Sequence, residues 1–446
     1  MSEVRSELKR VLILGGGFGG VYASRRLGPQ VKGRTAEVTL VSRDNYFVMT
    51  PLLFEAASGV IEFRHAVNPI RPLMCCTEFV NATVQSVDLA RREVLAESCA
   101  GDLYRLPYDH LVLALGAVTN TTRTPGSEHA LTFKTVHDAV QVRNRVIEAF
   151  ERADAEPDPA RRRAQLTFVV IGGGLVGTEL IGELTEFTGQ LFRSYPRLKR
   201  SELRLVQLQS GPRLLPEMAD GLAAYTEKTF RKRGVEVRTG TAAARIDRDG
   251  VALPDGTFIE AATVVLAAGL APNPIVAALD LPKDKSGRVV TDACMRVPGH
   301  EGVWAVGDCA SIPDAQGNPY PTLAQHALRE GKVLADNIAA VLKGREPQPF
   351  VYKTRGTMAA LGHRRGIADL MGLKVWGFLA WWVWRTYYLM QMPRWERRLR
   401  IMADWTVGVF FRPDAAKIDL TDEPAPGAPC EHEHECAPAI DPVARA

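Results

Sequence analysis

Residues 11–20 have the sequence Val-Leu-Ile-Leu-Gly-Gly-Gly-Phe-Gly-Gly. The four apolar residues predict a buried strand, and residues 21–27 behind the glycines predict a helix. In a G-x-G-x-x-G loop between a strand and a helix, the first glycine permits a tight turn, the second lets the backbone approach a pyrophosphate, and the third lets the helix pack against the strand. Gly15, Gly17 and Gly20 hold these places. The stretch predicts a Rossmann-like α/β fold that binds a dinucleotide, although a glycine-rich loop without a ligand has the same pattern.

The same pattern recurs in the middle of the chain. Phe168-Val169-Val170-Ile171 predicts a strand, Gly172, Gly174 and Gly177 hold the three glycine places, and residues 178–187 predict a helix. Two matches with strand, loop and helix in the right order argue against coincidence. A protein that holds two dinucleotides can place the nicotinamide of one against the flavin of the other, and hydride transfer is the chemistry that this arrangement serves. We therefore expect FAD in the first fold and NADH or NADPH in the second.

The residues expected at the ribose of the first nucleotide depart from the usual pattern. An acidic residue commonly follows the second strand, about 20 positions after the last glycine. Here a predicted strand at residues 37–41 is followed by Ser42, Arg43 and Asp44. Either Ser42 bonds the ribose hydroxyl or Asp44 reaches back to it, and the sequence does not choose between them.

The second fold carries Gln207 and Gln209 at the corresponding place, at the end of a predicted strand at residues 203–208. An amide neither repels nor strongly attracts the 2′-phosphate of NADPH, and Arg213 is a basic residue close by. The pattern favours NADH slightly and leaves NADPH open.

A third signal lies at residues 302–308, Gly-Val-Trp-Ala-Val-Gly-Asp. A short apolar strand that ends in Gly-Asp brings the backbone of Gly307 and the carboxylate of Asp308 to one place. This arrangement suits hydrogen bonds to the ribityl hydroxyls of a flavin, although Gly-Asp is also a common turn pair. We expect both residues in the flavin site.

The composition allows two or three domains with separate cores, because the chain has 446 residues, of which 46% are hydrophobic and 24% charged. Its formal charge of +4 includes an acidic segment at residues 413–446, and the rest holds 53 basic and 43 acidic residues, a net charge of +10. A basic body suits dinucleotide phosphates or acidic lipid, whereas no basic cluster is interleaved with stacking aromatics, so no nucleic-acid partner is expected. Seven cysteines without a C-x-x-C pair predict reduced thiols in a cytosolic compartment.

Several motifs together resemble the type II NADH:quinone oxidoreductases, single-subunit flavoenzymes within the glutathione-reductase-like superfamily. The resemblance spans residues 10–412, and the motifs occur in the family's order. They are Asn45-Tyr46-Phe47-Val48-Met49-Thr50-Pro51-Leu52-Leu53, Leu113-Ala114-Leu115-Gly116, Gly177-Thr178-Glu179-Leu180-Ile181-Gly182-Glu183-Leu184, Leu266-Ala267-Ala268-Gly269-Leu270-Ala271-Pro272-Asn273-Pro274, the Gly307-Asp308 strand and Ala324-Gln325-His326-Ala327.

The resemblance implies roles for particular residues. Glu179 is expected between the nicotinamide and flavin regions, where it joins proton transfer to the quinone, although an acidic residue early in a helix is also favourable by itself. Gln325 is expected on the quinone side, and no residue is expected to bind a metal. The other motif residues expected to contact the cofactors are Pro51, Gly116, Ala268 and Gly269.

Aromatic residues gather near the C-terminus, where six of the seven tryptophans lie between residues 376 and 405. The uncharged run 375–384 is too short for a membrane-spanning helix, which needs ~20 apolar residues. A two-faced helix behind it, rich in tryptophan and arginine, is typical of a segment in the membrane interface with its cations toward anionic lipid. A dimer interface or a domain core would show a similar composition. The apolar positions are Trp395, Leu399, Met402, Trp405 and Val409, and the polar ones are Arg394, Arg397, Arg398, Arg400 and Asp404.

The expected architecture is α/β, with two Rossmann-like dinucleotide-binding domains and a C-terminal membrane-facing amphipathic segment. An acidic, disordered tail ends the chain, and its Cys430–Cys436 segment lacks a surrounding fold that would organise a metal site. The boundaries are 1–124 and 288–345 for the FAD domain, 125–287 for the inserted NAD(P)H domain, 346–412 for the membrane-facing segment and 413–446 for the tail.

The resemblance implies an enzyme that passes electrons from NADH through FAD to a membrane quinone without proton pumping. It would be a peripheral protein on the cytoplasmic face of the cell membrane, either alone or as a homodimer. Two alternatives stay open. A sulfide:quinone oxidoreductase needs cysteines beside the flavin, an arrangement that Cys75-Cys76, Cys294 and Cys309 do not show. A nucleotide-sensing flavoprotein resembling apoptosis-inducing factor would bind NADH in order to change its partner surface.

Overall fold

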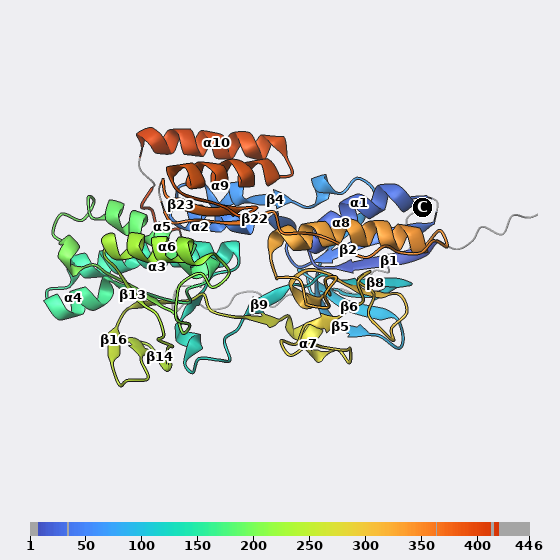
Figure 1. Ribbon diagram of the computed structural model, residues 1–446, viewed down its shortest axis with the longest axis horizontal. Helices are drawn as coiled ribbons and strands as arrows, with labels where there is room; N and C mark the ends of the chain where they lie inside the picture. The colour runs from blue at the N-terminus through green and yellow to red at the C-terminus, as the bar shows by residue number, and fades with distance from the viewer. Residues whose placement is uncertain (1–7, 34, 363, 412–413, 419–446) are drawn as a thin grey trace, which may run out of the picture.

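The computed structural model describes residues 8–33, 35–362, 364–411 and 414–418. Two Rossmann-type halves lie side by side, and a C-terminal layer of strands and helices covers one face of the molecule (Figure 1). The α/β class expected from the sequence is confirmed. Of the expected acidic tail, all but residues 414–418 lies outside the described residues.

The first half is built on a seven-stranded sheet in the order β20-β8-β1-β2-β5-β6-β7. The five strands from β20 to β5 pair in parallel, and β5, β6 and β7 pair antiparallel. Helices α1 and α8 pack together along this sheet, so a segment after residue 300 completes a sheet that begins near the N-terminus (Figure 1). The bounds are β1 Lys9–Leu14, α1 Phe18–Val31, β2 Ala36–Ser42, β5 Glu78–Asp88, β6 Glu93–Ser98, β7 Leu103–Pro107, β8 His110–Leu113, β20 Val303–Ala305 and α8 Ala324–Val341.

The second half is built on a five-stranded parallel sheet in the order β10-β17-β11-β12-β13. Its helix α3 starts at a capping box, in which Thr135 and Asp138 satisfy each other's backbone N–H groups. A small antiparallel sheet of β14, β15 and β16 extends this half. The bounds are β10 Leu131–Thr132, α3 Val136–Ala155, α4 Pro159–Gln165, β11 Thr167–Ile171, α5 Leu175–Leu191, β12 Arg204–Leu208, α6 Asp220–Lys232, β13 Val235–Arg238, β14 Arg245–Asp247, β15 Gly250–Ala252, β16 Phe258–Glu260 and β17 Thr263–Leu266.

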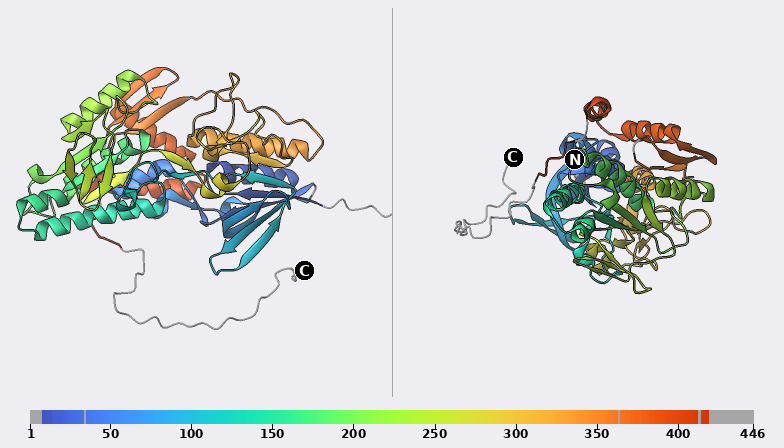
Figure 2. Two further views of the ribbon diagram at one scale, coloured as in Figure 1. Left: turned by 90° about the horizontal axis from the view of Figure 1, so that it is seen from below. Right: turned by 90° about the vertical axis from the view of Figure 1, so that its left-hand side faces the viewer.

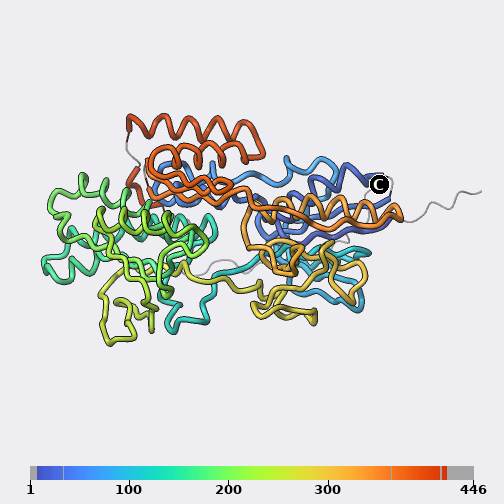
Figure 3. The backbone as a smooth tube through the Cα atoms, viewed as in Figure 1, coloured from blue at the N-terminus to red at the C-terminus, as the bar shows by residue number. Residues whose placement is uncertain are grey.

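The chain passes between the halves twice, and the two passages pair with each other. Strand β9 (Ala117–Thr119) leads out of the first half, and β18 (Leu270–Pro272) returns antiparallel to it. Figure 3 shows the returning segment in yellow, running beside the outgoing one toward the first sheet. Shorter elements are β3 Tyr46–Val48, η1 Thr50–Leu52, α2 Leu53–Ala57, η2 Phe63–Ala66, β4 Val67–Pro69, η3 Arg71–Leu73, η4 Ser127–His129, η5 Arg200–Glu202, α7 Pro274–Ala278, β19 Val289–Val290, η6 Gly307–Cys309 and β21 Ala310–Ser311.

The C-terminal layer consists of an antiparallel sheet, β22-β23-β24, followed by α9 and α10. Helix α10 runs along the outside of the molecule over α9 (Figures 1 and 2). Trp384, Met392 and Ile401 are fully buried in the core that this layer shares with both halves. Among the described residues, every helix falls short of the length and apolar character that crossing a membrane requires. The bounds are β22 Gly356–Ala360, β23 Gly366–Leu370, β24 Leu373–Gly377, α9 Phe378–Gln391 and α10 Trp395–Phe410.

Helix α10 is two-faced, but one of its tryptophans lies on the other face from the one expected. Trp395 and Leu399 are 69% and 51% exposed on the outer side. Trp405 instead turns inward, where its Nε1 donates a hydrogen bond to Oε2 of Glu55 at 2.7 Å. The expectation that Trp405 joins the outer apolar face is wrong, because the buried Glu55 carboxylate offers its indole N–H an acceptor.

The polar face of α10 is turned mostly toward the protein. The guanidinium of Arg397 donates to the backbone carbonyl of Arg64, and that of Arg398 donates to the carbonyls of Met390 and Met392. Asp404 accepts a hydrogen bond from the backbone N–H of Glu62. The expectation that all four arginines point toward lipid is therefore wrong for Arg397 and Arg398, because backbone carbonyls bind their guanidinium groups, whereas Arg400 is exposed.

Candidate active site

The first glycine loop combines close packing with one open position. Gly15 has a φ of +117°, and a Cβ atom there would lie 2.2 Å from the carbonyl oxygen of Ala114. A Cβ atom at Gly20 would lie 1.9 Å from the carbonyl oxygen of Gly15, so the helix meets the strand end where only glycine fits. At Gly17, by contrast, an added Cβ atom meets no described atom within 4 Å. The open side of Gly17, at the N-terminus of α1, is where a pyrophosphate fits.

The second glycine loop repeats this geometry. Gly172 has a φ of +126°, and a Cβ atom at Gly177 would lie 2.1 Å from the carbonyl oxygen of Gly172. At Gly174, the N-cap of α5, an added Cβ atom would approach only Oε1 of Glu217, at 3.1 Å. Gln209 lies beside this loop and accepts a hydrogen bond from the N–H of Gly173 at 3.0 Å. Both loops therefore have a backbone that packs tightly on one side and is open to a ligand on the other.

Of the two candidates for the first ribose, Ser42 and Asp44, it is Ser42 that lies against the glycine loop. A Cβ atom at Gly16 would lie 2.5 Å from Oγ of Ser42, which is buried. Arg43 and Asp44 pair with each other at the surface at 3.2 Å. In the second half, Gln207 is buried and donates to the carbonyl of Gly172 at 3.1 Å, so Gln209 is the glutamine that faces outward at this place.

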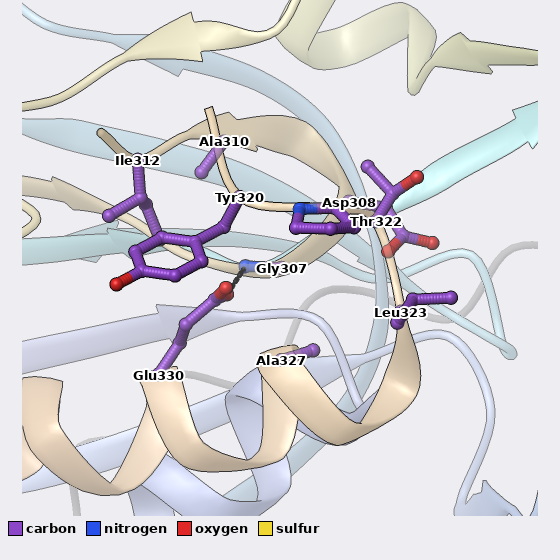
Figure 4. A pocket seen from close by; sticks show the side chains of 10 residues that line it. Gly307, Asp308, Ala310, Ile312, Tyr320, Thr322, Leu323, Ala327 and Glu330 are labelled. Carbon is purple, nitrogen blue, oxygen red and sulfur yellow. Dashed lines mark hydrogen bonds between the residues drawn. The ribbon is translucent and has the colours of Figure 1, made fainter. Parts of the chain in front are cut away.

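The Gly307-Asp308 turn lies against the first glycine loop. It follows strand β20, and a Cβ atom at Gly19 would lie 2.9 Å from the side chain of Val306. A shallow hollow is lined by this turn, Tyr320 and the start of α8 (Figure 4). The turn, the glycine loop and α8 therefore meet at one place, as a flavin site requires.

Two charged residues lie at this turn although the sequence did not predict them there; from the sequence, Glu330 is only a departure from the family's Ala-Gln-x-Ala-x-x-Gln motif. Glu330 rises from α8 and accepts a hydrogen bond from the N–H of Gly307 at 2.8 Å (Figure 4), and its burial raises the pKa of its carboxyl to about 7. Lys134 lies 3.8 Å from the carboxylate of Asp308, and burial lowers the pKa of its ammonium group. The position of Glu330 among the apolar positions of α8 could have indicated that its carboxyl is buried. Nothing in the sequence pairs Lys134 with Asp308, since 174 positions separate them.

The remaining motif residues lie in loops or turns. Gly116 and Gly269 have φ values of +66° and +73° and precede the paired strands β9 and β18. Ala268 lies beside Gly269, and Pro51 lies in the short η1 turn that leads into α2.

Gln325 lies in the first turn of α8, with both ends of its amide engaged. Its Nε2 donates to the carbonyl of Gly356 at 3.0 Å, and its Oε1 accepts from the hydroxyl of Tyr352 at 3.1 Å. The guanidinium of Arg329 stacks 4.4 Å from the centre of the Tyr352 ring. Gln325 therefore joins α8 to the C-terminal sheet.

Glu179 lies on α5 in the interior, where it is 6% exposed. Its Oε1 accepts hydrogen bonds from the backbone N–H of Ala360 at 2.9 Å and from Nε1 of Trp384 at 3.0 Å. Burial raises the pKa of this carboxyl to about 8 in spite of these two donors. At neutral pH Glu179 thus holds a proton, and the C-terminal layer covers it.

These features define a class of protein: an oxidoreductase with two Rossmann-type halves, each of which carries a glycine loop that is open to a nucleotide. Residues 9–331 match the pyridine nucleotide-disulphide oxidoreductase family, and residues 354–414 match the NDH2 C-terminal domain. The type II NADH:quinone oxidoreductase Ndh of Mycobacterium tuberculosis is 30% identical over 93% of this chain and 91% of its own. The chain therefore belongs to the pyridine nucleotide-disulphide oxidoreductases and, within them, to the type II NADH:quinone oxidoreductases.

Other relatives agree with this assignment. A probable NADH dehydrogenase of Dictyostelium discoideum is 30% identical over 92% of both chains. The structure of NDH2 from Plasmodium falciparum in complex with NADH has the same fold, with a TM-score of 0.86 at 19% identity over 92% of this chain and all of that one. A sulfide:quinone oxidoreductase from Aquifex aeolicus matches less closely, with a TM-score of 0.68 at 20% identity.

Proposed function

We propose that this protein oxidises NADH and reduces a membrane quinone, with FAD as its resident cofactor. The observation that carries this proposal is the presence, in one chain of this family, of two glycine cradles that are each open on the ligand side. Gly15, Gly17 and Gly20 hold FAD with the Gly307-Asp308 turn, and the second loop holds NADH. A flavin bound there supplies two-electron chemistry between a nicotinamide and a quinone.

We assign the proposed roles to three parts of the chain, the two halves and the C-terminal layer. The FAD domain comprises residues 1–124 and 288–345, and residues 125–287 form the NAD(P)H domain. Residues 346–412 close the site and carry the membrane-facing surface. Glu179 donates a proton to the quinone, and Gln325 positions the C-terminal sheet beside it.

A comparison of electron acceptors separates this function from its alternatives. We expect rapid steady-state oxidation of NADH with a soluble quinone and slow oxidation with no acceptor, and we expect no reduction of quinone by sulfide. Cys309, the cysteine next to Asp308, is buried, and burial raises the pKa of its thiol to about 12, which leaves it without the thiolate that sulfide chemistry uses. Slow turnover with every acceptor would favour a nucleotide sensor instead.

The preference between NADH and NADPH should be modest. The guanidinium of Arg213, the cation nearest in sequence, already donates to the carbonyls of Met218 and Pro216 and lies 3.3 Å from Asp220. Gln209 carries no charge to repel a 2′-phosphate. We therefore expect NADH to be favoured by less than about a thousandfold, or roughly 4 kcal/mol, in kcat/KM. Specificity constants for the two cofactors measure this directly, and a larger ratio would mean that other residues discriminate between them.

We further propose that the outer face of α9 and α10 attaches the protein to the cytoplasmic face of the cell membrane. Large apolar side chains there are exposed, among them Phe378, Trp382, Trp395, Leu399 and Phe410. Because two arginines of α10 are bound by backbone carbonyls, attachment depends on these apolar side chains more than on attraction to anionic lipid.

Replacing Trp395, Leu399 and Phe410 together by glutamate should release the protein from liposomes. Burial of a large apolar side chain is worth about 1.5–3 kcal/mol, so we expect partitioning to fall at least about a hundredfold. Liposome flotation at low and high salt measures this, and Leu103→Glu, a change at a 64% exposed position on β7, is the matched control. If wild-type protein does not float, the outer face is an interface with another protein or a second copy of this chain.

A further inference from the structure

A second hollow, of about 20 Å³ and so with room for about one water molecule, lies among α2, α5 and α9. Glu183, one helical turn along α5 from Glu179, lines this hollow and is 4% exposed. Oγ of Ser58 lies 2.9 Å from Oε2 of Glu183. A hollow lined by polar groups such as these can hold a water molecule that forms hydrogen bonds with them. The other lining residues are Glu55, Val60, Glu186, Phe187, Gln190, Trp381 and Arg385.

The carboxyls around this hollow differ in their partners. Glu55, on α2, forms an ion pair with Arg385 of α9 at 2.8 Å and accepts a hydrogen bond from Trp405. Among the described residues, Glu179 and Glu183 have no cation within 4 Å. Burial and, to a smaller extent, the nearby charge of Glu55 raise the pKa of the Glu183 carboxyl to about 8, although the hydrogen bond from Ser58 and the charge of Arg385 oppose the shift.

Two neighbouring carboxyls that hold protons at neutral pH and have similar pKa values can exchange a proton at little cost in free energy. Their Cβ atoms, four positions apart on one helix, are about 6 Å apart. Two further charged groups lie near Glu183: Glu186 on the same helix and the guanidinium of Arg233, which forms an ion pair with Glu186.

The proposed reaction needs a proton from water at a covered site. Reduction of a quinone to a quinol takes two electrons and two protons. NADH supplies both electrons and one proton in the form of a hydride, so the second proton comes from solvent in every turnover. Glu179 is the buried proton donor of the proposed function, and the C-terminal layer covers it through Ala360 and Trp384.

We propose that Glu183 relays this proton from water in the hollow to Glu179. The inference rests on the proposed quinone reduction and adds its proton path. Glu179 gives its proton to a quinone oxygen, Glu183 replaces that proton across one helical turn, and water in the hollow protonates Glu183 again. Ser58 holds the Glu183 carboxyl toward the hollow, and the ion pair of Glu55 with Arg385 forms its wall.

The test compares Glu183→Gln, Glu183→Asp and the control Glu151→Gln in the FAD-loaded protein. Glu151 is a carboxyl outside the hollow that accepts a hydrogen bond from Tyr195. In anaerobic stopped-flow experiments, Glu183→Gln should slow reoxidation of the flavin by a soluble quinone about tenfold to a hundredfold and enlarge its solvent isotope effect, because a relay group is lost. Reduction of the flavin by NADH should stay within about twofold of wild type.

Two further results separate a relay from a structural role. Glu183→Asp should restore most of the reoxidation rate. An infrared pH titration of the protein should show a protonated-carboxyl band that disappears as the pH rises through about 8, and this band should be weaker in Glu183→Gln. Reoxidation in Glu183→Gln as fast as in Glu151→Gln, or Glu183→Asp as slow as Glu183→Gln, would overturn the relay alone. A wild-type holoenzyme whose flavin is not reoxidised by quinone would refute the proposed function together with the relay.

Discussion

Replacing Gly17 by valine should yield a folded, colourless protein without FAD. The backbone at Gly17 is extended, and a Cβ atom there meets no described atom within 4 Å, so valine fits the protein itself. The same branched side chain would stand where the pyrophosphate approaches the loop. We expect the affinity for FAD to fall at least about a thousandfold, or roughly 4 kcal/mol. Visible absorbance after purification measures the bound flavin, and circular dichroism checks the fold.

The matched control is the same change in the other loop. Gly174→Val also meets little in the protein, since only the flexible end of Glu217 lies near the added Cβ atom. This variant should stay yellow and lose reduction by NADH, whereas chemical reduction of its flavin by dithionite should persist. A yellow Gly17→Val protein, or a colourless Gly174→Val protein, would reverse the assignment of the two loops.

Replacing Glu179 by glutamine should slow quinone reduction about a hundredfold, because general acid catalysis by a positioned group is typically worth that much. Glutamine keeps an oxygen that accepts from Ala360 and Trp384, so the fold is retained. Reduction of the flavin by NADH should be affected far less. Stopped-flow measurement of the two half-reactions separates these effects, and equal slowing of both would place Glu179 in nicotinamide binding instead.

The wild-type rate of quinone reduction should also depend on pH. Burial raises the pKa of Glu179 to about 8, so its carboxyl is protonated below that pH and ionised above it. A proton donor works only while it is protonated. The rate should therefore fall as the pH rises through about 8, and this fall should be absent from the slow Glu179→Gln protein.

The parts of the site that are local in sequence could be predicted from it. The two glycine loops each lie within about ten residues, and the roles of their three glycines follow from backbone sterics alone. The Gly307-Asp308 turn was recognisable for the same reason. Its partner Glu330 was not assigned, because the hydrogen bond to Gly307 depends on how α8 packs beneath the turn.

The parts that depend on contacts across the chain could not be predicted. Trp384 donates to Glu179 across 205 positions, and Trp405 donates to Glu55 across 350. The helical spacing of α10 located an amphipathic helix, but spacing cannot show which face a buried carboxylate will attract. The arginine face was assigned to lipid for this reason, although backbone carbonyls bind two of its side chains.

The central claim is that one flavin takes electrons from NADH and gives them to a quinone. Its most direct test is an anaerobic double-mixing experiment, in which the FAD-loaded protein is reduced with one equivalent of NADH and then mixed with quinone in liposomes. We predict that flavin absorbance bleaches with NADH and returns with quinone, at a rate no slower than steady-state turnover. Flavin that bleaches with NADH and stays reduced in the presence of quinone would contradict this account.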